Sequence, residues 1–152
     1  MNTAAIIGFV NLLCVGILAG EEFTICYGVR APVASLDDGP HIQVRQALIY
    51  RLRILVPAIW ALTILSAIAV TIGNGVDIGF AFRCAGMVVL FIFMVITLGG
   101  TVPINKAALT WDPAAPPANW RALISRWERL NTARCWLAVG AFALFLAAIA
   151  LR

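Results

Sequence analysis

The chain has 152 residues, of which 62% are hydrophobic and only 12% are charged. Soluble domains carry about 25% charged and about 45–50% apolar residues, so this composition excludes a soluble enzyme and a disordered protein. The formal net charge of +4 comes from 11 Lys and Arg against 7 Asp and Glu. These are too few cations for a phosphate-binding face, and we expect no nucleic-acid partner. The composition predicts an integral membrane protein whose partner is the lipid bilayer.

Four segments without Asp, Glu, Lys or Arg approach the length of about 20 residues that a helix needs to cross the hydrocarbon core. Their apolar residues are continuous, which is typical of helices and not of barrel strands. The charge-free segments are residues 1–20, 54–76, 84–105 and 135–151. The first lacks the basic start of a signal peptide, so we expect a retained span.

These segments predict an all-α fold, an integral membrane four-helix bundle that forms a single domain over residues 1–152. We expect spans at about 4–28, 54–73, 82–103 and 135–151. The segments that join spans 1 and 2 and spans 3 and 4 hold nine of the 11 cations, and the opposite side holds only Arg83 and Arg152. The positive-inside rule therefore places both long segments in the cytoplasm and both termini outside, in the cell inner membrane if the protein is bacterial.

The segment between the first two spans starts with turn-forming residues. Residues 30–40 include two Pro, two Asp and one Gly, so we expect a turn there. From residue 41 to residue 53 apolar side chains recur on one helical face. This pattern predicts an amphipathic helix that runs into the second span, with Pro57 as the position for a bend.

The second long segment has the same layout. Residues 111–117 contain three prolines and cannot be helical, and Asn119 is a suitable N-cap for the helix that follows. From Trp120 to Leu151 that helix would be about 48 Å long at about 1.5 Å per residue. Helices 2 and 4 are therefore expected to extend beyond the membrane on the cytoplasmic side, where they form a vestibule.

Two acidic residues and one histidine are candidates for chemistry at this vestibule. Glu21 and Glu22 interrupt an apolar stretch that resumes to residue 29. If helix 1 continues past them, a carboxylate lies at the membrane boundary and Glu22 is a functional candidate; if it ends at Gly20, both are hydrated. His41 could act as a general base, as an axial ligand of haem b, or only as a residue at a helix start. With one histidine, a multi-histidine metal site is not expected.

Polar residues near the ends of spans 3 and 4 are further candidates. Asn105 follows a proline, while its neighbour Lys106 has the simpler interpretation of a snorkelling cation. Trp127, Asn131 and Arg134 are spaced i, i+4 and i+7, so they share one helix face. The tryptophans could belong to an interfacial belt, but an Asn and an Arg on the same face favour a pocket wall.

The order Val-Pro-Ile-Asn at 102–105, a Pro-rich loop, Trp120, and Arg-Trp-Glu-Arg-Leu-Asn-Thr-Ala-Arg at 126–134 resembles the anthrone-oxygenase-like family of small four-span membrane proteins. The resemblance is most specific over 102–136, and Gly-Glu-Glu-Phe at 20–23 is similar to a bacterial branch. Characterised members oxidise an anthrone to an anthraquinone with dioxygen, without an evident flavin or nicotinamide motif. The resemblance implies Asn105, Trp127, Asn131 and Arg134 as motif positions.

The resemblance implies a membrane-embedded oxygenase-like protein that takes a hydrophobic, anthrone- or quinone-like small molecule into a cytoplasmic-side pocket. Glu22 or His41 would be the catalytic base, and Asn105 or Arg134 would hold the phenolate oxygen. The residues expected to bind the substrate are Arg45, Trp120, Trp127 and Asn131. Two alternatives stay open, a haem- or small-ligand-binding protein that uses His41 and a small proton-coupled transporter that uses a helix 1 glutamate. A homo-oligomer is also compatible with the sequence.

Overall fold

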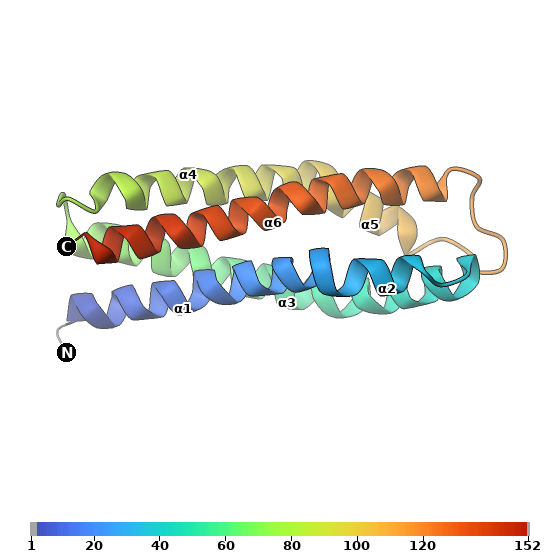
Figure 1. Cartoon of the computed structure of the whole chain (residues 1–152), viewed down its shortest axis with the longest axis horizontal. Helices are drawn as coiled ribbons and strands as arrows, with labels where there is room; N and C mark the ends of the chain where they lie inside the picture. Colours follow the sequence, from blue (N-terminus) through green and yellow to red (C-terminus); the bar gives the residue numbers. More distant parts are fainter. Residues whose placement is uncertain (1–2, 152) are drawn as a thin grey trace.

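The computed structural model describes residues 3–151, which form four long helical columns lying side by side and running alternately in opposite directions (Figure 1). The first column consists of α1 (Thr3–Phe23), the π-helix η1 (Thr24–Val29) and α2 (Arg30–Ala34). The second is α3 (Asp38–Asn74), and the fourth is α6 (Trp120–Ala150). The third column consists of α4 (Phe80–Ile96), the π-helix η2 (Thr97–Thr101) and α5 (Val102–Ala108).

Within the described residues there is no strand, and each column is long and apolar enough to cross a membrane by length and composition. Large apolar side chains cover the outside of the bundle, for example Ile54, Ile72 and Phe91. Such a surface is unfavourable in water and suits a lipid environment. The prediction of an all-helical, four-helix membrane bundle is thereby confirmed, and the chain is a multi-pass integral membrane protein.

The two ends of the bundle differ. Figure 1 shows both chain ends and the short α3–α4 turn at one end, while the α2–α3 and α5–α6 connections lie at the other, here called the connection end. The second column has 37 residues and the fourth has 31, so they are about 55 Å and about 46 Å long. Both exceed a hydrocarbon core of about 30 Å, but so do the first column (residues 3–34) and the third column (residues 80–108), so the extension predicted for helices 2 and 4 is shared by all four columns.

The first connection is far shorter than its composition predicts. Most of residues 30–40 is helical, because the first column continues to Ala34 and α3 already begins at Asp38. Pro40 lies in the first turn of α3, where a missing N–H removes no helical hydrogen bond. The prediction of a turn over residues 30–40 is therefore wrong, and only residues 35–37 connect the two helices.

The sequence left open whether the first helix ends at Gly20 or continues past Glu21 and Glu22, and the helix boundaries in the structure settle this. The first column continues past Gly20, so Glu21 and Glu22 lie inside a helix that extends over Ala5–Ala34. Residues 109–119 are not helical, as their prolines predict. Asn119 directly precedes α6 but makes no side-chain capping hydrogen bond.

Tight apolar contacts fill the half of the bundle near the chain ends, around Leu18, Leu90 and Phe145. There the buried Arg83 closes the α3–α4 turn with hydrogen bonds of 2.8 Å to an Asp77 carboxylate oxygen and 2.8 Å to the Gly75 carbonyl. A smaller apolar cluster occupies the connection end. The candidate site lies in this second half of the bundle. Residues 1, 2 and 152, which the predicted domain includes, lie outside the described residues.

Candidate active-site pocket

A pocket of about 410 Å³ lies inside the connection half of the bundle, and all four columns contribute to its wall. Small-molecule sites commonly have volumes of about 300–1,000 Å³, with a mostly apolar lining and a few polar groups that orient the ligand. The apolar part of this wall includes Ile25, Leu48, Val56, Met94 and Leu98. The pocket is therefore large enough for a compact organic molecule.

Unpartnered polar atoms are concentrated at this pocket. Among the described residues, ten buried side-chain nitrogen or oxygen atoms have no hydrogen-bond partner, and nine of them belong to residues of the pocket wall. Folded proteins pair the great majority of such atoms, so a cluster of exceptions calls for a specific explanation. The nine residues are Glu21, Glu22, His41, Arg45, Trp60, Asn105, Trp127, Asn131 and Arg134. Their arrangement provides both donors and acceptors to a bound molecule.

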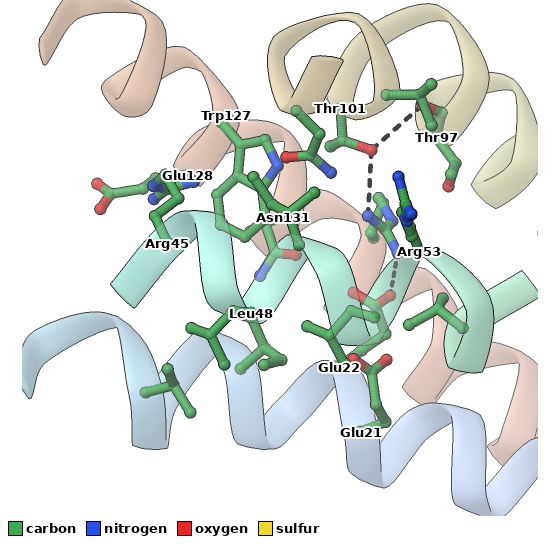
Figure 2. Close-up of a pocket in the computed structure, with 18 of the residues that line it drawn as sticks. Glu21, Glu22, Arg45, Leu48, Arg53, Thr97, Thr101, Trp127, Glu128 and Asn131 are labelled. Atoms are coloured by element: carbon green, nitrogen blue, oxygen red, sulfur yellow. Dashed lines mark hydrogen bonds and ion pairs between the residues drawn. The ribbon is translucent and has the colours of Figure 1, made fainter. Parts of the chain in front are cut away.

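One polar cluster in the wall is built around Arg134 of α6, and its partners Glu22 and Thr101 are labelled in Figure 2. Its guanidinium donates to Glu22 Oε1 and, at 3.1 Å, to Thr101 Oγ1. The Arg134 Cζ atom also lies 4.7 Å from the centre of the Phe93 ring. These contacts leave Glu22 Oε2 and Arg134 Nε without partners. A fixed carboxylate thus presents one free oxygen at the pocket.

A second polar cluster lies further along the pocket, toward the start of α6. In Figure 2, Arg45, Trp127 and Asn131 lie toward one side and Glu21 and Glu22 toward the other. The Arg45 Cζ atom stacks 4.6 Å from the centre of the Trp127 ring. The unpartnered atoms here are Arg45 Nε, Trp127 Nε1 and Asn131 Nδ2, which are all donors. The same pocket therefore holds unpartnered donors from Arg45, Trp127 and Asn131 as well as the unpartnered carboxylate oxygen of Glu22.

His41 and Trp120 lie together at the connection end of the bundle. The His41 ring meets the Trp120 ring edge-on, with 5.2 Å between ring centres. His41 lines both the main pocket and a second pocket of about 160 Å³, whereas Trp120 lines only the second. Trp120 also contacts Trp111, with 6.4 Å between ring centres. Its observed place is behind His41 and not on the wall of the main pocket.

The structure brings seven of the eight predicted site residues to the wall of the main pocket, Trp120 being the eighth. The seven are Glu22, His41, Arg45, Asn105, Trp127, Asn131 and Arg134. Sequence reasoning gave little or no role to Glu21, Arg53, Trp60 and Thr101, which also line the pocket. Thr101 directly precedes the Val-Pro-Ile-Asn motif, which is the signal that could have found it. Trp60 lies within a charge-free span and carried no such signal.

The pocket wall also contains an ion pair between two columns, and no cluster of metal-binding side chains lies among the described residues. Among residues 3–151, no group of three or more His, Cys, Asp or Glu side chains could hold a metal ion. Arg30 forms an ion pair with Glu128 at 3.4 Å and donates to Thr132 Oγ1 at 3.1 Å. This contact joins the first and fourth columns beside the pocket.

The fold and this site define a four-helix membrane protein with an internal pocket that carries unpaired polar groups. A family model described as anthrone oxygenase matches residues 46–144, which is 99 of the 152 residues. The chain therefore belongs to the anthrone oxygenase family. The match includes Asn105, Trp127, Asn131 and Arg134, and it excludes Glu22, His41 and Arg45. No curated protein and no solved structure matches the chain.

Proposed function

We propose that this protein oxidises a hydrophobic aromatic ketone of the anthrone type to the corresponding quinone, with dioxygen as the oxidant. The observation that carries the proposal is the gathering of nine residues with unpartnered buried polar atoms on one apolar pocket of an anthrone oxygenase family member. A flat ketone with oxygen atoms on its edges would satisfy these atoms, and its rings would contact apolar and aromatic wall residues.

The free oxygen of Glu22 is the best placed base. A methylene carbon between two aromatic rings and opposite a ketone is acidic, and a ligand that spans the pocket can present this carbon to Glu22 Oε2. The ketone oxygen then lies toward Asn131 and Trp127, whose N–H donors have no other partner. Donors directed at the oxygen where negative charge develops lower the barrier to proton removal. Arg134, held by Glu22 and Thr101, fixes the direction of the carboxylate.

The proposed reaction balances with dioxygen alone. Glu22 takes one proton from the methylene, and the electron pair of that C–H bond spreads onto the ketone oxygen. This anion reduces dioxygen, a C–O bond forms at the same carbon, and the proton returns from Glu22 to give a hydroperoxide. Loss of the second methylene proton then breaks the O–O bond and releases water. One anthrone and one dioxygen give one anthraquinone and one water, so the carbon is oxidised and dioxygen is reduced.

The test compares two adjacent carboxylates in the purified protein. We expect Glu22→Gln to lower anthrone-dependent oxygen consumption by about 10²–10⁴-fold, the usual contribution of a general base. Glu21→Gln is the comparison variant, because Glu21 lines the same pocket but makes no hydrogen bond to Arg134, and it should lower turnover much less than Glu22→Gln does. In Glu22→Gln the amide oxygen still accepts a hydrogen bond from Arg134, so this variant should stay folded, and binding of anthraquinone should persist in both variants. Wild-type turnover by Glu22→Gln would contradict the proposed role of this base.

One observation favours a second candidate, a haem-binding protein. His41 is buried, its Nε2 atom has no hydrogen-bond partner, and it lines the main pocket. A neutral imidazole nitrogen of this kind is a common axial ligand of haem iron. An absorption spectrum of the purified protein with a Soret band that disappears in His41→Ala would establish this candidate. A spectrum without that band would favour direct oxygenation.

A further inference from the structure

The exposed part of the pocket wall is confined to one seam of the bundle. Four wall residues are exposed, and they belong either to α3 or to the η2–α5 segment: Arg53, Pro57, Leu98 and Lys106. Wall residues contributed by the first and fourth columns are all buried or half-buried. The most exposed part of the wall therefore lies between α3 and η2–α5, and we take this seam as the opening of the pocket.

Helix contacts explain why this seam is open. The first column packs closely on α3 and on α6, and α4 packs closely on α6, but α3 makes much sparser contact with α4 and α5. Gly100 allows η2 to lie against α6, because a Cβ atom there would stand only 2.7 Å from Leu130 Cδ1. On the other side of the seam, Pro57 interrupts the hydrogen bonds of α3. A π-helix thus borders the seam on one side, and a helix with an internal proline borders it on the other.

The surface around the opening is the kind that faces lipid. Ile54 is 69% exposed, Val95 55% and Leu98 60%. Arg53 and Lys106 directly flank the charge-free segments that begin at residue 54 and end at residue 105. Cations at such positions reach the lipid headgroups. The opening therefore lies where the hydrocarbon core meets the headgroup layer, which is also where flat aromatic molecules with polar edges accumulate.

We propose that the substrate enters the pocket sideways from the bilayer, through the opening bounded by Arg53, Pro57, Leu98 and Lys106. This inference rests on the proposed function, because its occupant is an apolar aromatic ketone dissolved in the membrane. Leu98 narrows the opening, and Arg53 and Lys106 attract the oxygen-bearing edge of the ligand. The alternative route starts in water at the second pocket and passes His41 to reach the main pocket. Ala34 lines this second pocket, so a larger side chain there would obstruct the aqueous route.

The experiment measures how fast anthraquinone reaches the pocket tryptophans of the whole protein in phosphatidylcholine nanodiscs. A Trp136→Phe background removes an exposed tryptophan, and the readout is the saturable quenching of the remaining fluorescence. Leu98→Phe should slow both association and dissociation by about tenfold, as a barrier higher by about 1.4 kcal/mol requires. Its Kd should stay within about twofold of the parent value, since an obstruction in a passage acts on both directions. Leu98→Ala widens the passage and should therefore accelerate both association and dissociation of anthraquinone.

Two control variants make the outcome decisive. Ile92→Phe adds the same bulk to an exposed residue of the same column that does not line the pocket, so its rates should equal those of the parent. Ala34→Phe obstructs the second pocket and should also leave the rates unchanged. Slower binding in Ala34→Phe with normal rates in Leu98→Phe would overturn lateral access in favour of the aqueous route. Absence of saturable quenching in the parent, or an altered Kd without an altered association rate in Leu98→Phe, would overturn it too.

Turnover is measured separately from these rates. If anthraquinone binds with the expected rate changes but anthrone consumes no oxygen, the proposed reaction fails while lateral access stands. If anthrone is oxidised but Leu98→Phe binds as fast as the parent, lateral access fails while the reaction stands.

Discussion

Glu22 and Arg134 form a buried ion pair although 112 positions of the chain separate them. Their side chains are only 2% and 7% exposed. Because Arg134 also donates to Thr101, this one guanidinium connects the first, third and fourth columns at the pocket. Each charge is tolerated in the bundle interior because the other compensates it, and the same contact holds the carboxylate in place for chemistry.

Removing the cation of this pair should destabilise the fold strongly, because no donor to the Glu22 carboxylate then remains. Arg134→Met leaves Glu22 as an uncompensated buried charge, and breaking a buried pair in this way costs about 3–5 kcal/mol. The double variant Glu22→Gln/Arg134→Met should recover most of this loss, since neither charge then remains. Denaturant unfolding in detergent micelles, followed by circular dichroism, measures both variants.

The matched control is the ion pair between Asp38 and Arg121, whose side chains are 45% and 72% exposed. Exposed pairs contribute about 0–1 kcal/mol, so Arg121→Met should change the free energy of unfolding by less than about 1 kcal/mol. If Arg121→Met and Arg134→Met lowered the free energy of unfolding equally, burial of the Glu22–Arg134 pair would not increase its contribution to stability.

The sequence predicted the helices well because charge and hydropathy are local properties. A residue such as Arg45 or Asn131 could be placed near the vestibule from its position on an amphipathic helix. The failure over residues 30–40 has a local cause as well: Pro, Asp and Gly favour turns and also suit the first turn of a helix, and composition alone does not separate these cases.

Partners between columns could not be predicted in the same way. Nothing in the sequence pairs Glu22 with Arg134 rather than with another cation, because this choice depends on the rotation of two helices about their axes. The same rotation directs Trp60 to the pocket and sets Trp120 behind His41. Leu98 and its seam depend on the spacing between α3 and η2, which no periodicity in the sequence encodes.

The stacked pair of Arg45 and Trp127 should contribute directly to ligand binding. Arg45→Gln removes a cationic donor whose Nε atom has no protein partner, and a hydrogen bond to a charged group is worth about 1.5–3 kcal/mol. The Kd for anthraquinone should therefore rise by about 10–100-fold in a tryptophan-quenching titration. Arg51→Gln, at an exposed position of the same helix outside the pocket wall, should bind as the parent does. An unchanged Kd in Arg45→Gln would remove this residue from the binding site.

A glycine at a helix contact should prove sensitive to a single methyl group. A Cβ atom at Gly86 would stand 2.8 Å from the ring of Phe145, which is 1% exposed and has little room to move. Gly86→Ala should lower the free energy of unfolding by about 1–3 kcal/mol, the usual effect of excess volume in a tightly filled core. At Gly140 a Cβ atom would meet nothing within 4 Å, so Gly140→Ala should be neutral or stabilising. Equal stabilities of the two variants in detergent unfolding would contradict this account of the α4–α6 contact.

The orientation in the membrane gives a last prediction, which rests on the charges of the connections. If the positive-inside rule holds, the exposed Ala115 in the α5–α6 connection faces the cytoplasm and the exposed Val76 in the α3–α4 turn faces outward. A membrane-impermeant maleimide should therefore label Val76→Cys on spheroplasts, and it should label Ala115→Cys only after the membrane is opened. The unsubstituted protein measures the background from the four native thiols. The opposite labelling pattern would reverse the orientation, because helices that alternate in direction keep these two connections on opposite sides of the membrane. The pocket would then lie toward the outer surface, and the substrate would have to reach the opening from the outer leaflet.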